Sequence, residues 1–174
     1  MISPVTVVVG NPKPASRTLD AAVRVAEALT GAPPGRVVDV VTLGPGLLGW
    51  GDEDVRAAVQ AVASSRLAVV ASPTFKATYS GLLKLFLDQF AGGEGMAGVT
   101  VVPLMLGAGP AHALAPELLL RPVLAELGAT LPAPGLYLTD STYTEDGRYQ
   151  AYCDTWGGTL RASALATPGT GLRA

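Results

Sequence analysis

Residues 10–18 carry side chains suited to binding an anion. The stretch reads GNPKPASRT, and it precedes an apolar repeat of helical period that begins at Leu19. The N-terminus of a helix presents free N–H groups and a partial positive charge, so such a turn attracts anions. A phosphate monoester would find an amide, two hydroxyls and two cations in Asn11, Ser16, Thr18, Lys13 and Arg17. The alternative is a structural turn in which Thr18 caps the helix and the cations are solvated.

A second stretch, SPTFKATYSG at residues 72–81, is suited to a flat ligand. Pro73 and the small residues around it permit close approach of the backbone, whose N–H and C=O groups can read the edge of a ring. Phe75 and Tyr79 offer aromatic faces. In the alternative reading Phe75 belongs to the core and Tyr79 to the surface, and composition alone does not decide between them.

The third stretch, GAGPAHALA at residues 107–115, follows another apolar run. Gly107 and Gly109 allow the backbone to approach a ligand closely. His112 is the only histidine of the chain, and alone it forms neither a metal site nor a catalytic triad. Acidic residues do not cluster in any of the three stretches, and Ser72 is not in a GxSxG motif. These absences argue against metal-dependent hydrolysis, paired-carboxylate chemistry and an α/β-hydrolase.

One stretch has the glycine spacing of a nucleotide-binding motif, but the residues that follow it do not fit such a site. GPGLLG at residues 44–49 matches GxGxxG, yet Trp50, Gly51 and Asp52 delay the next helix. No acidic residue follows at the spacing of about 20 that holds a ribose. Residues 10–18 lack the second glycine followed by lysine and serine or threonine of a P-loop. We therefore interpret GPGLLG as a loop.

Composition indicates one domain with part of its surface covered. The 174 residues suit a single domain over 1–174. Charged residues make up only 15%, against about 25% in typical proteins, which predicts a homodimer or homotetramer. A net charge of -2 without basic runs argues against nucleic acid and membrane surfaces as partners. The single cysteine, Cys153, excludes an internal disulfide, and with an N-terminus unlike a signal peptide it predicts a cytoplasmic protein.

The three stretches are separated by alternating strand and helix patterns. Apolar runs predict strands at residues 5–9, 36–43, 67–71, 99–106 and within 131–138. Helical patterns occupy residues 19–30, 52–63, 80–90 and 149–165, with an irregular helix that Pro116 begins and Pro122 kinks. We expect Asp52 to cap the second helix and the tail 166–174 to be flexible. Such alternation predicts an α/β fold, a five-stranded parallel sheet of order 2-1-3-4-5 with ligands at the carboxyl ends of its strands.

Three longer stretches carry a family resemblance. GNPKPASRT, SPTFKATYSGLLKLFLDQF and GAGPAHALAPELLLRPVLAELGA occur in this order, and together they resemble the NAD(P)H-dependent FMN reductase family over about residues 5–138. The likeness is greatest to reductases of the alkanesulfonate-assimilation type. It implies a flavodoxin-like three-layer sandwich and an oxidoreductase that uses FMN and NADPH or NADH. It also implies a homo-oligomer and a partner monooxygenase that receives reduced FMN.

The resemblance also implies site residues. The flavin phosphate and ribityl chain would be held by Asn11, Lys13, Ser16, Arg17 and Thr18. The isoalloxazine would be bordered by Pro73, Thr74, Phe75 and Lys76, with Ser80 close by, and supported on its other side by Gly107, Ala108 and Gly109. Hydride passes directly between nicotinamide and flavin, so no catalytic side chain and no metal are expected. The chain departs from many relatives at Asn11, where they have serine, and at Lys13, where they have arginine. At Leu118 some relatives carry an aromatic residue.

The same sequence features are compatible with other functions. A quinone, azo or chromate reductase with tightly bound FMN is compatible with the same motifs. A flavodoxin-like electron carrier would not be an enzyme, but such carriers are usually strongly acidic, unlike a chain of net charge -2. A structural subunit that has lost flavin binding is a third alternative. The sequence does not decide between NADH and NADPH or name the electron acceptor.

Overall fold

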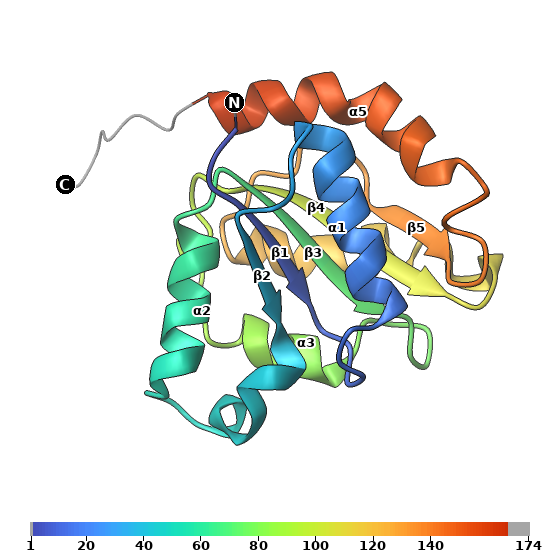
Figure 1. The fold of residues 1–174 in the computed structure, drawn as a ribbon. Helices are drawn as coiled ribbons and strands as arrows, with labels where there is room; N and C mark the ends of the chain where they lie inside the picture. The colour runs from blue at the N-terminus through green and yellow to red at the C-terminus, as the bar shows by residue number, and fades with distance from the viewer. Residues whose placement is uncertain (1, 167–174) are drawn as a thin grey trace.

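A five-stranded parallel sheet forms the centre of the protein (Figure 1). The computed structural model describes residues 2–166, so 167–174 of the tail that we expected to be flexible lie outside the described residues. The strands are β1 (Val5–Val9), β2 (Arg36–Asp39), β3 (Leu67–Pro73), β4 (Thr100–Gly107) and β5 (Leu136–Thr139). Their spatial order is β2-β1-β3-β4-β5, which confirms the predicted topology.

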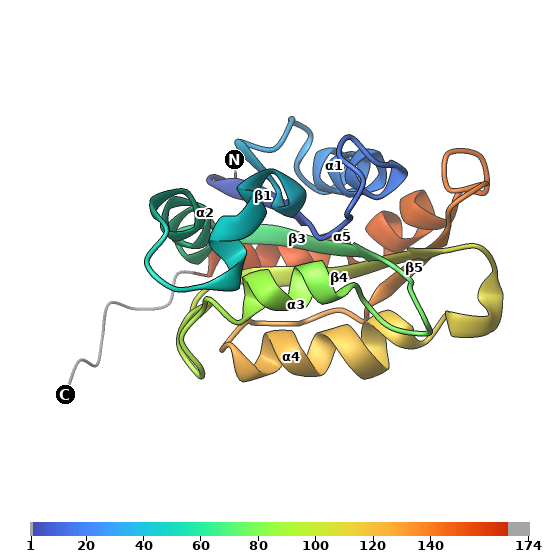
Figure 2. The same ribbon diagram turned by 90° about the horizontal axis from the view of Figure 1, so that it is seen from below.

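Helices cover both faces of the sheet, which makes three layers. On one face lie α1 (Arg17–Thr30) and α5 (Arg148–Leu165), and Arg161 of α5 donates a hydrogen bond to the Leu29 carbonyl of α1 at 3.2 Å. On the other lie α2 (Glu53–Ala63), α3 (Gly81–Leu87) and α4 (Arg121–Glu126). Figure 2 shows α3 and α4 together on the side of the sheet away from α1. Successive strand residues alternate between two cores because side chains of a strand point to opposite faces.

The first helix begins two residues earlier than the sequence indicated, at Arg17. Its cap is Ser16, whose hydroxyl oxygen accepts a hydrogen bond from the Leu19 N–H at 3.3 Å. The alternative that Thr18 caps this helix is therefore wrong. For α2 the predicted cap is confirmed, since an Asp52 carboxylate oxygen accepts from the N–H groups of Asp54 and Val55 at 3.0 Å.

The second strand is shorter than predicted. Pairing with β1 stops at Val9 and Asp39, so β2 ends there and not at residue 43. A 3-10 segment, η1 (Val40–Leu48), follows and buries Val40 and Leu47 against the core shared by α2 and α3. An apolar run buried this way resembles a strand in sequence. The GPGLLG motif, which we interpreted as a loop, lies largely in the 3-10 segment η1, with a break at Gly44, and it does not form the strand-to-helix turn of a dinucleotide site.

The region between β4 and β5 is irregular, as the two prolines predicted. A short π-helical turn, η3 (Pro116–Leu120), precedes α4, and Pro122 falls in the first turn of α4, where no N–H donor is needed. The fifth strand begins only at Leu136, five residues later than the start of the predicted segment. Pro132 and Pro134 lack the N–H that a strand ladder requires, which explains the delay. Two further boundaries differ from the prediction by two or more residues. β3 extends two residues further, to Pro73, and α3 ends three residues earlier, at Leu87.

No helix of the described residues is long and apolar enough to cross a membrane.

Candidate functional site

The carboxyl ends of four neighbouring strands bring the predicted loops to one edge of the sheet. The parallel register sets Val9 beside Ala71, and Pro73 beside Leu106. The loops after β1, β3, β4 and β5 therefore emerge next to one another, as the topology requires. Two adjoining pockets lie there, and we call them the anion pocket and the glycine pocket.

The anion pocket contains all five residues predicted to bind phosphate. Its volume is about 240 Å³. Its lining consists of Asn11, Lys13, Ala15, Ser16, Arg17, Thr18, Pro73, Phe75, Leu106 and Asp140. The first loop thus meets the start of the loop after β3, as predicted, while Ala15, Leu106 and Asp140 were not among the predicted residues. Two cations and one acid face this pocket.

Hydrogen bonds within the first loop give it a defined shape. The Asn11 amide accepts from the Lys13 N–H at 2.9 Å and donates to the Thr18 hydroxyl at 3.0 Å. Ala15 adopts a left-handed backbone with φ 49°, and its N–H donates to Asp39 at 3.2 Å. Burial raises the pKa of Asp39, although the Ala15 N–H opposes this shift. Asn11 is therefore engaged in shaping the loop, whereas Lys13 remains exposed to a ligand.

Arg17 contacts the loop that follows β5. Its guanidinium Nη1 donates to the Asp140 carbonyl at 3.1 Å, and Nη2 lies 3.8 Å from the Asp140 carboxylate. The Arg17 side chain is still 64% exposed, so it has room to bind an anion in the pocket. Sequence analysis missed Asp140. Asp140 could have been found only from the predicted topology, because the carboxyl end of a fifth parallel strand must lie at the same edge of the sheet.

The glycine pocket, of about 540 Å³, is formed mainly by the loop after β4. Its lining consists of Thr74, Gly107, Ala108, Gly109, Pro110, Ala111, His112 and Tyr137. The hydroxyl of Tyr137, another residue missed in the sequence, donates to the Gly109 carbonyl at 2.7 Å. A Cβ added at Gly107 would lie 2.0 Å from that hydroxyl and 3.2 Å from Thr74 Oγ1. Only glycine fits here without displacing the tyrosine.

Thr74 presents a buried polar atom without a protein partner. Among the described residues, its Oγ1 is inaccessible to solvent and makes no hydrogen bond. An unpaired buried hydroxyl costs free energy, because it has lost its hydrogen bonds to water. A ligand in the glycine pocket would remove this cost if the Thr74 side chain rotated to present Oγ1 to it.

The other residues predicted from the loop after β3 have different roles. Phe75 is 47% exposed, so the alternative that it belongs to the core is wrong, and its ring is available to a ligand. Lys76 has a left-handed backbone with φ 50° and lines neither pocket. Ser80 is buried, donates to the Gly10 carbonyl and accepts from the Leu83 N–H at 3.0 Å. It ties the loops after β1 and β3 together and lines neither pocket.

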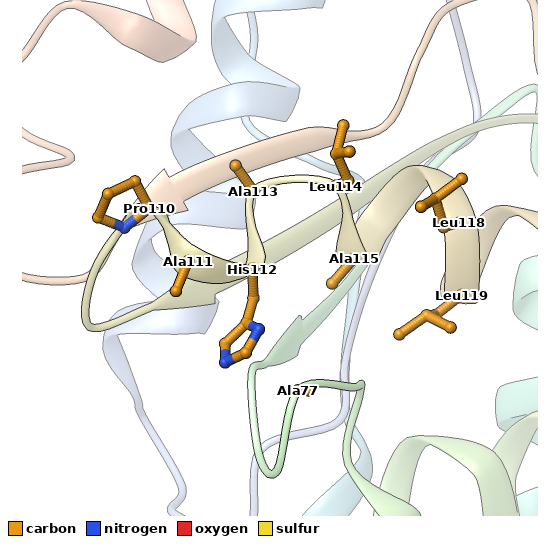
Figure 3. Close-up of a pocket in the computed structure, with 9 residues that line it drawn as sticks. All are labelled: Ala77, Pro110, Ala111, His112, Ala113, Leu114, Ala115, Leu118 and Leu119. Carbon is orange, nitrogen blue, oxygen red and sulfur yellow. The ribbon is translucent and has the colours of Figure 1, made fainter.

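His112 lines both the glycine pocket and a second pocket of about 350 Å³, which we call the apolar pocket. Figure 3 shows its ring directed toward the segment that contains Ala77. The apolar pocket is lined by alanines, Pro110 and the leucines Leu114, Leu118 and Leu119, with no carboxylate and no nucleophile. Within residues 2–166, no three His, Cys, Asp or Glu side chains are grouped so as to hold a metal ion. His112 therefore has no partner there that would make it a triad member or a metal ligand.

Known proteins resemble this chain in sequence and in fold. Residues 4–144 match the model of a family described as NADPH-dependent FMN reductase. A protein of Escherichia coli named FMN reductase (NADPH) is 41% identical over 73 residues, which are 42% of this chain and 38% of that protein. A protein of Pseudomonas putida with the same name is 37% identical over 82 residues, which are 47% of this chain and 41% of that protein. The matches thus span about two fifths of the length of these curated relatives.

Solved structures extend the likeness over nearly the whole chain. The apo form of an NADH:FMN oxidoreductase has a TM-score of 0.79 and 28% identity, covering 95% of this chain and 90% of the other. An oxidised flavodoxin from Bacillus cereus has a TM-score of 0.58 at 12% identity, covering 91% and 97% of the two chains. At that identity the likeness shows the fold alone, and it confirms the predicted flavodoxin-like architecture.

Proposed function

The chain belongs to the NADPH-dependent FMN reductase family, because the family model matches 4–144 of its 174 residues, and on this premise we propose that it is an enzyme that reduces FMN with NADPH or NADH. FMN would take up a hydride from the nicotinamide, and the oxidised nicotinamide would leave. The observation that carries this proposal is the junction of a cation-lined pocket with a glycine-walled one that holds an unpaired hydroxyl.

The residues present fit FMN at both ends of the molecule. A phosphate suits the anion pocket, where Lys13 and Arg17 supply charge at the N-terminus of α1. A flat ring suits the glycine pocket, since Gly107, Ala108 and Gly109 give one part of its wall little side-chain bulk. The unpaired Thr74 hydroxyl would gain a partner from the polar edge of such a ring. Pro73 and Phe75 line the anion pocket on the side of the loop after β3.

The protein's contribution in this proposal is binding and orientation. The anion pocket positions one end of the flavin, and the stiff wall formed by Gly107, Gly109 and Tyr137 limits where the ring can lie. Fixing two reactants in contact removes a large entropic cost from their reaction. None of the residues that line the glycine pocket is acidic, and its only titratable groups are His112 and the hydrogen-bonded Tyr137. This composition suits hydride transfer, which needs no side-chain acid or base.

We further propose that FMN is an exchangeable substrate and that its reduced form is passed to a partner monooxygenase. Support comes from the solvent exposure of a cationic side chain in the anion pocket, since Arg17 is 64% exposed.

We propose homo-oligomerisation as well, because three leucines are exposed in one apolar surface. Leu114, Leu118 and Leu119 are 66%, 62% and 39% exposed. Light scattering of the wild type and of Leu118→Arg tests this assembly, and an unchanged mass with the charge in place would contradict it.

Flavin content and turnover, measured together, test the function. The purified protein is examined for bound flavin by its visible spectrum, and FMN is then titrated against NADPH and NADH oxidation in air. A colourless protein whose rate rises with added FMN is expected. A yellow protein that reduces quinones without added FMN would favour a bound prosthetic group. If neither nicotinamide is oxidised and no flavin binds, the proposal is wrong.

Arg17→Ala tests the phosphate assignment. A charge-assisted hydrogen bond of about 1.5 kcal/mol predicts FMN affinity about tenfold weaker, with riboflavin affinity unchanged. Arg56→Ala is the matched control, since Arg56 is 68% exposed, ion-paired and on α2 outside the anion pocket. Equal effects of Arg17→Ala on both flavins would contradict the assignment.

A further inference from the structure

We propose that Asp140 is a specificity-determining residue whose carboxylate weakens the hold on the flavin phosphate, so that FMN exchanges with solution instead of staying bound. This inference rests on the proposed function and deepens it. It concerns the one acidic side chain among the residues that line the anion pocket.

The position of Asp140 places a negative charge beside the anion that the pocket would bind. Its carboxylate oxygen lies 3.8 Å from Arg17 Nη2. A phosphate that accepts a hydrogen bond from this guanidinium, at about 2.8 Å, would lie within about 7 Å of the Asp140 carboxylate. That separation is shorter than the screening length of about 8 Å at physiological salt. The two negative groups would therefore repel each other.

The same carboxylate does little to hold Arg17 in place. The hydrogen bond from Arg17 Nη1, at 3.1 Å, goes to the Asp140 backbone carbonyl and does not need the side chain. The ion pair itself joins side chains that are 64% and 36% exposed, and ion pairs of this kind contribute little. Asp140 is fixed independently, because its N–H donates to the Gly107 carbonyl at 2.9 Å. Repulsion of the phosphate is thus the main effect left to the carboxylate.

Coulomb's law sets the size of the effect. A phosphate with about two negative charges at about 6.6 Å, in surroundings close to water, binds about eightfold more weakly in the absence of salt because of the carboxylate. Screening at about 0.15 M salt reduces this to about threefold. Riboflavin has no phosphate, so its affinity should not respond. FMN-selective and salt-dependent weakening is the signature of this mechanism.

Asp140→Asn tests the proposal, since asparagine keeps the size of the side chain and the backbone contacts. Dissociation constants of FMN and riboflavin are measured by quenching of flavin fluorescence at about 0.02 M and 0.15 M salt, and FMN release is timed by stopped flow. The variant is expected to bind FMN about fivefold more tightly at about 0.02 M salt and about threefold more tightly at about 0.15 M salt, and to release it more slowly. Glu53→Gln is the control, because it removes the same charge from a 3.5 Å ion pair on α2.

The outcomes separate this inference from the proposed function. If Asp140→Asn binds FMN more weakly than the wild type, the carboxylate positions Arg17 and the proposal is overturned. Unchanged FMN affinity, or an equal gain for riboflavin, also overturns it while leaving the reductase function intact. A wild type that binds neither flavin overturns both. Asp140→Ser, which also lacks the charge, gives a second reading should the asparagine variant fold poorly.

Discussion

Replacing Gly107 with alanine would force the added carbon onto Tyr137. The backbone does not oppose the change, because Gly107 belongs to β4 and is not among the residues with positive φ. The new Cβ would lie 2.0 Å from the Tyr137 hydroxyl and 3.0 Å from the ring carbon that bears it. The ring must therefore move, and its 2.7 Å hydrogen bond to the Gly109 carbonyl is lost.

The magnitude follows from two separate costs. Overpacking costs about 1–3 kcal/mol, and the lost hydrogen bond adds about 0.5–1.5 kcal/mol. Tyr137→Phe alone removes only the hydrogen bond, so it should cost about 0.5–1.5 kcal/mol. In the double variant, the hydroxyl that blocks the Cβ of Ala at residue 107 is absent. Its destabilisation should be smaller than the sum of the two single variants by about 1–2 kcal/mol.

Urea unfolding of the four proteins, followed by tryptophan fluorescence, measures this coupling. Gly109→Ala is a matched control, because a Cβ at Gly109 meets no atom within 4 Å. It should unfold close to the wild type. FMN titration of the same proteins should show weaker binding in Gly107→Ala and partial recovery in the double variant. If the two changes are additive within about 0.5 kcal/mol, the steric argument is refuted.

Three further predictions concern residues away from the two pockets. Asp52→Ala removes the cap of α2 and should lower the free energy of unfolding by about 1 kcal/mol, with unchanged FMN affinity; weaker FMN binding would show coupling between α2 and the pockets. Burial opposes ionisation of Asp20, but hydrogen bonds from Arg24 and Tyr143 outweigh it and lower the pKa of Asp20. Its stabilisation is thus present above about pH 4 and lost as the pH falls below that value, so Asp20→Asn should lower the urea midpoint at pH 7, and a gap undiminished at pH 3 would contradict this. Burial raises the pKa of Cys153 to about 11, so at pH 8 it should react with a disulfide reagent only after urea is added, and rapid reaction of the folded protein would contradict its burial.

Strand order and the convergence of loops followed from the sequence because they depend on long, regular patterns. Five apolar runs separated by helical repeats permit few arrangements, and the parallel one places the ends of the strands together. The predicted ends of strands and helices were less accurate where two kinds of secondary structure could bury the same apolar residues. Val40 and Leu47 are buried in a 3-10 segment, and nothing in an apolar run distinguishes this from a strand.

Two polar residues of the site that the sequence missed belong to no local motif. Tyr137 and Asp140 belong to β5 and the residue directly after it, and they reach the pockets only through pairing of β5 with β4. Residues 10–18 were recognised as a candidate anion site because their polar and charged side chains lie close together in the sequence. Which residue of that loop caps the helix could not be predicted from the sequence, since Ser16, Thr18 and Asn11 are all residue types that cap helices.

The distance in sequence between the parts of the anion pocket affects when it can exist during synthesis. Arg17 and Asp140 are 123 residues apart, although their atoms are in contact. A ribosome adds about 5–20 residues per second, so about 6–25 seconds separate the appearance of these two residues. A nascent chain therefore presents the cationic loop long before the strand that completes its pocket. Any ligand that needs the whole pocket can bind only the finished chain, and it then stabilises the folded state by mass action. The supply of that ligand in the cell would in this way influence how much newly made protein stays folded.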